Sequence, residues 1–161
     1  MTREQYISLV TNTQEAFRRF LVALCCGDTA LADDIAQDSY VKAYLSCDSL
    51  KNVDRFKNWL FRIAYNTYLD KKRAEQVFEA PEEAHHVLAE TETDSKFRYQ
   101  ALYQALARLS KKERTAILLF YMQGYSAREI ADMMATSQDA VRQYLLRGRM
   151  HLRNLITSKN Q

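Results

Sequence analysis

The chain has 161 residues, and its hydrophobic fraction of 47% provides enough apolar material for one domain or two small ones. Three Gly and one Pro leave little of the chemistry that tight turns need, which favours helices and almost excludes sheet. The net charge of +3 is too small to indicate a nucleic-acid partner by itself. No apolar run approaches the length of a membrane span, and no signal peptide is visible, so we expect a cytoplasmic protein without membrane insertion.

Two helices are predicted in the first 46 residues. The first spans residues 4 to 26, and Gly27 can end it in the left-handed conformation. The second spans about Thr29 to Ser46, and Asp28 can cap it. The apolar residues expected to face the core from the second helix are Leu31, Ile35, Val41, Tyr44 and Leu45. Its other side carries an acidic patch of Asp33, Asp34, Gln37 and Asp38. These residues alone are consistent with solvated surface and equally with a docking surface for a basic partner.

A third helix is predicted from a cap at Asp54 to about Gln76. One side of it forms a buried stripe of Phe56, Leu60, Ile63 and Thr67, with Trp59 beside the stripe. The polar residues on another side are Arg55, Arg62, Asn66 and Arg73. The aromatic residues between the two sides are Phe61, Tyr65 and Tyr68. Rings among cations suit single-stranded DNA, because bases stack on the rings and cations follow the phosphates. An ordinary amphipathic helix with an aromatic core face explains the pattern as well.

The charges are unevenly distributed along the rest of the chain. Glu75 to Asp94 holds seven acidic residues and no Lys or Arg, whereas five basic residues and one acidic residue follow from Gln138 onward. Helical periodicity is lost over residues 77 to 95, which include Pro81. We therefore predict an all-α protein of two small helical domains, residues 1–76 and 96–161, joined by a flexible acidic linker, residues 77–95.

The sequence from Ser126 to Ile156 predicts a helix-turn-helix in the second domain. Ser126 and Glu129 form a capping box, Ala135 and Thr136 break the helix, and Ser137 can cap the next one. An inward face of the second helix is formed by Val141, Leu145, Gly148, Leu152 and Ile156. The residues left facing outward are Arg142, Gln143, Leu146, Arg147 and Arg149. Such a helix fits the major groove of DNA, where Arg pairs with guanine and Gln with adenine.

No catalytic constellation is visible in the sequence. There is no Gly-rich phosphate loop, no zinc-ligand spacing, and no Ser or Cys nucleophile with a base placed beside it. Cys25, Cys26 and Cys47 are expected to be small buried hydrophobic residues. We therefore expect no enzymatic activity, no cofactor and no metal.

Three segments in this order resemble one family. They are the acidic helix Ala32–Tyr44, the aromatic-basic helix Arg55–Arg73, and the helix-turn-helix introduced by Leu106–Leu118. Together they are similar to the bacterial sigma-70 family, and specifically to its extracytoplasmic-function (ECF) subfamily, which keeps only the second and fourth domains. The resemblance covers nearly the whole chain, from about Tyr6 to Leu155.

The resemblance implies a protein without catalytic activity that binds core RNA polymerase and directs it to promoter DNA. It implies that the acidic patch docks on the clamp coiled coil of the large polymerase subunit. The expected −10 residues are Asn52, Arg55, Trp59, Arg62 and Asn66. The expected −35 residues are Gln138, Arg142, Gln143 and Arg147, with Arg149 on phosphate. It further implies an anti-sigma factor as a partner.

The sequence departs from the family pattern at the turn and in the recognition helix. Ala135 and Thr136 stand where the family usually has Gly and an aliphatic residue, and Gly148 replaces a usual Ala. Tyr144 and Leu146 stand where Arg and His are frequent, so the resemblance gives no promoter contact there. The alternatives are a stand-alone helix-turn-helix regulator with an N-terminal partner-binding domain, and an interaction protein that sequesters a partner without touching DNA.

Overall fold

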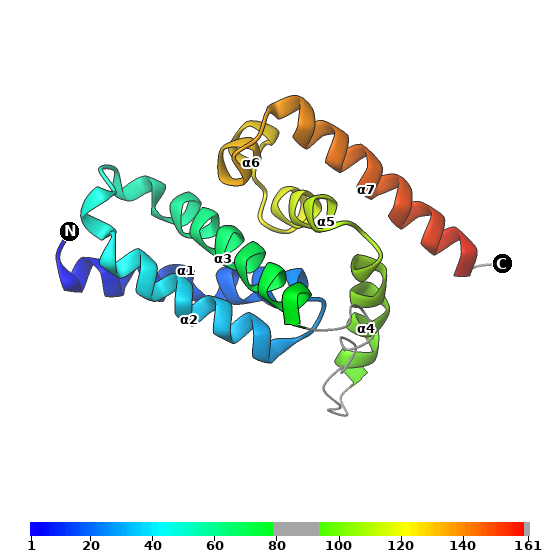
Figure 1. Cartoon of the computed structure of the whole chain (residues 1–161), viewed down its shortest axis with the longest axis horizontal. Helices are drawn as coiled ribbons and strands as arrows, with labels where there is room; N and C mark the ends of the chain where they lie inside the picture. The colour runs from blue at the N-terminus through cyan, green and yellow to red at the C-terminus, as the bar shows by residue number, and fades with distance from the viewer. Residues whose placement is uncertain (79–93, 160–161) are drawn as a thin grey trace.

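The computed structural model describes residues 1–78 and 94–159, and all regular structure in these ranges is helical (Figure 1). The N-terminal half, residues 1–78, contains α1 (Arg3–Leu24), α2 (Thr29–Leu45) and α3 (Phe56–Phe78), with short 3-10 turns at Cys47–Ser49 and Val53–Arg55. The C-terminal half, residues 94–159, contains α4 (Asp94–Ala107), α5 (Lys111–Ile117), a π-helical turn (Leu118–Met122), α6 (Ala127–Met134) and α7 (Gln138–Lys159). The predicted all-α class is confirmed for the described residues.

Residues 79–93, which hold most of the predicted acidic linker, lie outside the described ranges. Among the described helices, none is both long and apolar enough to cross a membrane.

Most of the predicted helix boundaries are confirmed by their capping bonds. The Asp28 carboxylate accepts from Leu31 N at 3.1 Å. The first helix ends at Leu24, two residues before the predicted end, and both Cys26 (φ 55°) and Gly27 (φ 91°) adopt positive φ after it. Asp54, predicted to cap the third helix, does not do so. Its own N–H donates to the Asn52 side chain at 3.0 Å, so Asn52 caps the short 3-10 turn that leads into α3.

The core of the N-terminal half is built on aromatic side chains from α1 and α3. Phe61 lies 5.3 Å from Phe17 and 5.0 Å from Phe20, measured between ring centroids, and all three rings are almost completely buried. Leu60 and Ile35 are fully buried beside them. Close aromatic packing of this kind fixes the angle between the two helices, because rings prefer edge-on and offset contacts.

The prediction for the apolar face of α2 is wrong at three positions. Val41, Tyr44 and Leu45 are 58%, 45% and 77% exposed. The buried face of α2 instead carries mostly small side chains, namely Ala32, Ile35, Ser39 and Ala43. Small residues let α1 and α3 approach α2 closely, and their weak hydrophobic contrast hides the true face in the sequence.

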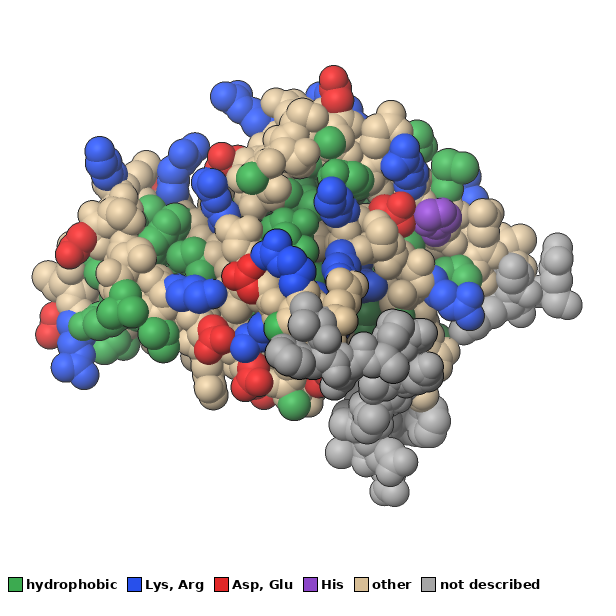
Figure 2. All heavy atoms as spheres, viewed as in Figure 1, with side chains coloured by type: hydrophobic (Ala, Val, Ile, Leu, Met, Phe, Trp, Pro, Cys, Tyr) green, Lys and Arg blue, Asp and Glu red, His purple; other side chains and the backbone are tan. Residues whose placement is uncertain are grey.

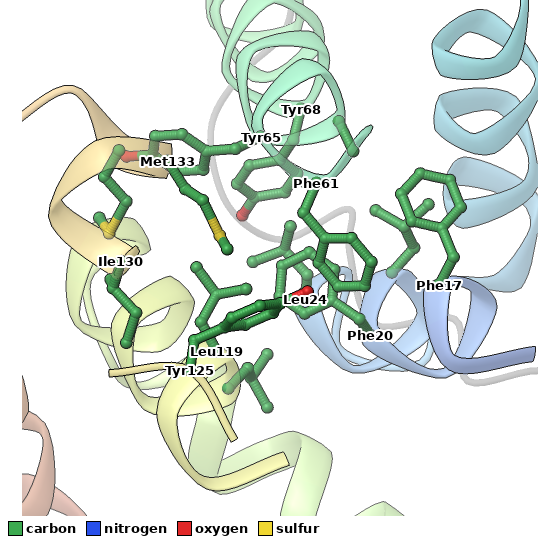
Figure 3. Close-up of a cluster of buried hydrophobic side chains, with 14 of the residues drawn as sticks. Phe17, Phe20, Leu24, Phe61, Tyr65, Tyr68, Leu119, Tyr125, Ile130 and Met133 are labelled. Atoms are coloured by element: carbon green, nitrogen blue, oxygen red, sulfur yellow. The ribbon is translucent and has the colours of Figure 1, made fainter. Parts of the chain in front are cut away.

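Three aromatic residues of α3 lie against the C-terminal half (Figure 3). Phe61, Tyr65 and Tyr68 are buried, and in the close-up they point toward Leu119, Tyr125, Ile130 and Met133. The sequence pattern had placed these rings beside the polar face of α3, where they suit unpaired bases. In this arrangement they are core residues of the contact between the two halves.

Gly148 allows α7 to pack closely on α5. A Cβ atom at this position would lie 2.7 Å from Ile117 Cγ1 and 3.1 Å from Ile117 Cδ1. Real Cβ atoms do not approach other carbons so closely, so any larger residue must displace Ile117 or the helix itself. The departure from the family pattern at Gly148 therefore has a packing reason.

We predict that Gly148→Ala destabilises the protein. Overpacking a tight contact costs about 1–3 kcal/mol, whereas Ala gains roughly 1 kcal/mol of helix propensity, so the expected net loss is about 1 kcal/mol. Denaturant unfolding gives this value. In an Ile117→Ala background the same change should be neutral or stabilising, because the clashing side chain is gone. An equal loss in both backgrounds would contradict the packing explanation.

Candidate nucleic-acid interface

The helix-turn-helix is held by two capping arrangements. Ser126 N donates to Glu129 Oε1 at 2.9 Å and Glu129 N donates to Ser126 Oγ at 3.2 Å, which completes the predicted capping box of α6. The backbone hydrogen bond from Ser126 lowers the pKa of Glu129. Ser137 Oγ accepts from Ala140 N at 3.1 Å and begins α7. Both predicted helix starts are therefore confirmed.

The turn between α6 and α7 contains a strained residue. Ala135 has φ 53° and ψ 52°, the left-handed conformation that glycine adopts without penalty. Ile130, Met133 and Met134 anchor the helix before it, with exposed fractions of 0%, 1% and 8%. The buried face of α6 thus holds the turn in place despite its unfavourable residue.

The outer face of α7 carries the residues predicted to read DNA. All of them are exposed: Gln138, Arg142, Gln143, Arg147 and Arg149. Val141 and Leu145, on the opposite face, are 0% and 4% exposed, so the predicted inward face is confirmed at these two positions. The side chain of Ile156 lies outside the description.

Two of these arginines are oriented by neighbours that the sequence analysis did not identify. Arg142 Nη1 donates to Asp139 Oδ1 at 2.9 Å and its Nη2 donates to Gln138 Oε1 at 3.3 Å. Arg149 Nη1 donates to Tyr121 Oη at 3.2 Å. Asp139 lies three residues before Arg142 on the same helix face, so this contact could have been predicted from the sequence spacing. The contact between Arg149 and Tyr121 joins distant residues, and no sequence pattern predicts it.

The residues predicted to contact the −10 element lie on and just before α3. Asn52, Arg55, Arg62 and Asn66 are exposed, whereas Trp59 is half-buried with its ring edge against Phe56, 6.1 Å between centroids. Arg62 and Asn66 are one helical turn apart and share one side of α3, whereas Arg55 lies in the 3-10 turn that precedes it. The buried aromatic residues of α3 occupy another side.

The acidic patch of α2 is on the surface, as predicted. Asp33, Asp34, Gln37 and Asp38 are all exposed, and Figure 2 shows acidic side chains over the region of α2 while Lys and Arg are frequent along the upper edge. Two of the carboxylates have partners within the chain: Arg18 Nε lies 3.3 Å from Asp33 and Lys71 Nζ lies 2.9 Å from Asp38. The hydrogen bond to Asp38 raises the pKa of Lys71.

The prediction that all three cysteines are buried is confirmed only for Cys25. Cys25, Cys26 and Cys47 are free thiols, of which Cys25 is buried and the other two are half-buried. Burial raises the pKa of Cys25 to about 12, so this thiol stays protonated at neutral pH. Among the described residues, no group of three His, Cys, Asp or Glu side chains has the geometry of a metal site.

These features define a helix-turn-helix protein with an exposed basic recognition helix and a separate acidic helix. Comparison with known families gives two matches in chain order. Residues 9–77 match "Sigma-70 region 2" and residues 99–152 match "Sigma-70, region 4".

Characterised relatives cover most of the chain. It is 30% identical over 142 residues to the ECF RNA polymerase sigma factor SigW of Bacillus subtilis (strain 168), covering 79% of this chain and 76% of the relative. It is 32% identical over 136 residues to the RNA polymerase sigma factor NccH of Alcaligenes xylosoxydans xylosoxydans, covering 78% and 73%.

Two solved structures share the fold. One is the sigma factor RpoE in complex with the anti-sigma factor NepR from Bartonella quintana, with a TM-score of 0.74, 24% identity, and coverage of 92% of this chain and 94% of that one. The other is CnrH in complex with the cytosolic domain of CnrY, with a TM-score of 0.75, 25% identity, and coverage of 98% and 90%. The chain belongs to the ECF group of the sigma-70 family, which confirms the family predicted from the three sequence segments.

We predict that Ala135→Gly stabilises the protein. A non-glycine residue in the left-handed region costs about 1–2 kcal/mol, and glycine loses roughly 0.5–1 kcal/mol through the greater freedom of the unfolded chain. The expected gain is therefore about 0.5–1 kcal/mol, measured as a shift of the denaturant midpoint. Ala140→Gly, within the first turn of α7, is the control and should destabilise. A loss of stability on Ala135→Gly would show that the turn is not strained.

Proposed function

We propose that this protein is an ECF-type sigma factor that binds core RNA polymerase and directs it to promoters, acting in the cytoplasm as an initiation factor without catalysing a reaction. Membership of the family supports this proposal. Residues 1–76 form the polymerase and −10 domain, residues 96–161 form the −35 domain, and residues 77–95 connect them. The observation that carries the proposal is that the acidic face, the α3 polar face and the α7 basic face are all exposed.

The −35 element is read by α7 in the major groove. Arg142 and Gln143 supply the donor and acceptor patterns that match guanine and adenine edges. The hydrogen bonds that Arg142 donates to Asp139 and Gln138 hold its guanidinium at the start of the helix, where recognition helices meet bases. Arg149, which follows by two turns, is directed toward Tyr121 at the side and contacts phosphate.

The −10 element is contacted by the outer side of α3 and by the turn before it. Asn52 uses its carbonyl oxygen as a cap, which leaves its amide N–H groups to donate to a base. Arg55 and Arg62 follow the phosphates, and Asn66 lies one turn beyond Arg62. Trp59 supports this surface by packing on Phe56 and offers only part of its ring to DNA.

The polymerase docks on α2, through charge at one end and apolar contact at the other. Asp34 and Gln37 lie beside the carboxylates already paired with Arg18 and Lys71. Asp33, Gln37, Val41 and Leu45 recur every four residues, so the acidic surface continues directly into the exposed apolar end of the helix. A basic coiled coil of the large polymerase subunit with apolar side chains along one stripe matches both parts.

An anti-sigma factor is a further proposed partner. Both structural neighbours were solved with such a protein or with the cytosolic domain of a second protein. The alternative of a stand-alone helix-turn-helix regulator predicts DNA binding without polymerase. Mixing the purified protein with core RNA polymerase separates the two: a stable complex and promoter-dependent transcription are expected, and the absence of both rejects the proposal.

We predict that Arg142→Ala weakens one promoter element selectively. Losing an arginine contact to a base edge costs about 1–3 kcal/mol and relaxes specificity at that position. Arg149→Ala is the matched control, because loss of a phosphate contact weakens all sequences similarly and reduces the salt dependence. Binding of holoenzyme to promoters with single −35 substitutions gives both values. Equal losses by Arg142→Ala on every sequence would place this residue on phosphate.

We predict that Asp34→Ala reduces affinity for core polymerase while leaving the fold intact. This carboxylate is exposed in the acidic patch, so the expected loss is about 1.5–3 kcal/mol, the range for hydrogen bonds to charged groups. Asp132→Ala, an exposed acidic residue of α6, changes the net charge equally and should have no effect. Titration of labelled protein with core polymerase measures both. Unchanged binding in both variants would remove α2 as the docking surface.

A further inference from the structure

An exposed leucine stands among the polar residues on the outer face of α7. Leu146 is 47% exposed, whereas its neighbour Leu145 is 4% exposed and faces inward. The residues beside Leu146 on the outer face are Arg142 and Gln143, one turn earlier, and Arg149, almost one turn later. Single exposed apolar side chains are common on protein surfaces, so the exposure alone decides nothing. The position of this leucine on the helix is what carries the argument.

Both flanking arginines are drawn away from Leu146. Arg142 donates to two acceptors in the preceding turn, at 2.9 and 3.3 Å, so its guanidinium lies toward the start of the helix. Arg149 donates to Tyr121 Oη at 3.2 Å and is directed toward the π-helical turn. Neither long side chain therefore covers the leucine, which remains open to a partner that approaches the outer face.

The side chain of Leu146 leans toward the turn that is proposed to read bases. Side chains of an α-helix point toward its N-terminus, so each covers the surface over the preceding turn. For Leu146 this turn holds Arg142 and Gln143, which match guanine and adenine edges. Four residues at about 1.5 Å each separate Leu146 from Arg142 by about 6 Å, close to two base-pair steps of about 3.4 Å. Leu146 therefore meets a base pair within about two steps of the one that Arg142 contacts.

A leucine side chain matches only one group in the major groove. It has no hydrogen-bond donor or acceptor, and the C5-methyl group of thymine is the apolar group that base pairs present there. Against a G·C pair, Leu146 would remove polar groups from water without replacing their hydrogen bonds. Against thymine it removes two apolar groups from water together. An A·T pair is therefore the favourable partner.

The outer face of α7 is accessible in this structure. Figure 1 shows α7 along one edge of the molecule, with α5 between it and α3. The helices against which α7 mainly packs are α4, α5 and α6, all in the C-terminal half. Tyr144, the other recognition-helix residue that departs from the family pattern, is half-buried, and its ring centroid lies 6.0 Å from Lys112 Nζ. Of these two departures, Leu146 is the one that reaches the outer face.

We propose that Leu146 is a specificity-determining residue that reads the C5-methyl group of a thymine in the −35 element. It selects an A·T pair beside the pairs contacted by Arg142 and Gln143. The contact lies at a position for which the family resemblance gives none. This inference rests on the proposed function, because it requires α7 to enter the major groove of that element.

The test compares thymine with uracil in the promoter. Holoenzyme assembled from core RNA polymerase and the full-length protein first selects its preferred −35 element from duplexes randomised over that region. Each thymine of the selected element is then replaced singly by deoxyuridine, which keeps base pairing and removes only the methyl group. One replacement, within about two steps of the base pair that Arg142→Ala no longer discriminates, should weaken binding about fourfold, equivalent to about 0.8 kcal/mol. Leu146→Ala holoenzyme should bind the thymine and uracil duplexes equally.

Leu102→Ala is the matched control, because Leu102 of α4 is 43% exposed and lies outside the recognition helix. This variant loses the same atoms and should keep the preference for thymine over uracil, whatever its overall affinity. Leu146→Met retains an apolar tip and should also keep the preference.

Equal binding of thymine and uracil duplexes by the parent holoenzyme at every position would overturn the methyl contact. An unchanged thymine preference in Leu146→Ala would overturn it too. A loss of affinity in Leu146→Ala that is the same on every duplex would assign this leucine to a protein contact instead. Failure to form a holoenzyme, or a holoenzyme that selects no −35 element, would overturn the proposed function together with the contact, so the two failures are distinguishable.

Discussion

The contact around Phe61 is the interaction on which the arrangement of this molecule depends. This ring packs on Phe17 and Phe20 within the N-terminal half and on Tyr125 from the C-terminal half. One side chain of α3 therefore belongs to two cores at once. Because of this, α3 has its polar side available to solvent while its aromatic side is used for assembly, and the acidic face of α2 remains uncovered.

Local signals in the sequence identified most of the fold. The capping box at Ser126 and the caps at Asp28 and Ser137 involve residues three apart, so their bonds can be predicted without knowing the tertiary structure. The exposed face of α7 follows from the same short-range periodicity. Prediction failed where the evidence is not local. The core face of α2 is made largely of small residues, and the true cap before α3 is Asn52 rather than Asp54.

The contact between the halves could not be predicted from periodicity. Arg114 and Leu24, which are hydrogen-bonded across this contact, are 90 positions apart, and in the sequence Arg114 looks like an ordinary basic residue of a short helix. Only the fold shows that it is buried. The same holds for Tyr65 and Tyr68, whose rings fit stacking on bases or burial equally well until the neighbouring half is seen. Sequence reasoning therefore recovered the separate helical units and left their mutual placement open.

Three charged residues of the proposed interfaces form ion pairs within the chain. Arg142 is paired with Asp139, Asp33 with Arg18, and Asp38 with Lys71. Exposed pairs of this kind contribute about 0.2–1 kcal/mol each, so a macromolecular partner can replace them at little cost. Until then the pairs limit the conformations of the side chains, which reduces the entropy lost on binding.

The π-helical turn at Leu118–Met122 sets the direction of everything that follows it. Such a turn accommodates one more residue than an α-helix does over the same length, and each residue of an α-helix rotates the chain by about 100°. Its wider winding sets the direction, around the helix axis, in which Tyr121 faces Arg149. It also sets the direction in which the chain leaves the helix at Gly124, where φ is 76°. Removing one residue from this segment would restore regular helical winding and change the direction in which the chain continues toward α6 and α7.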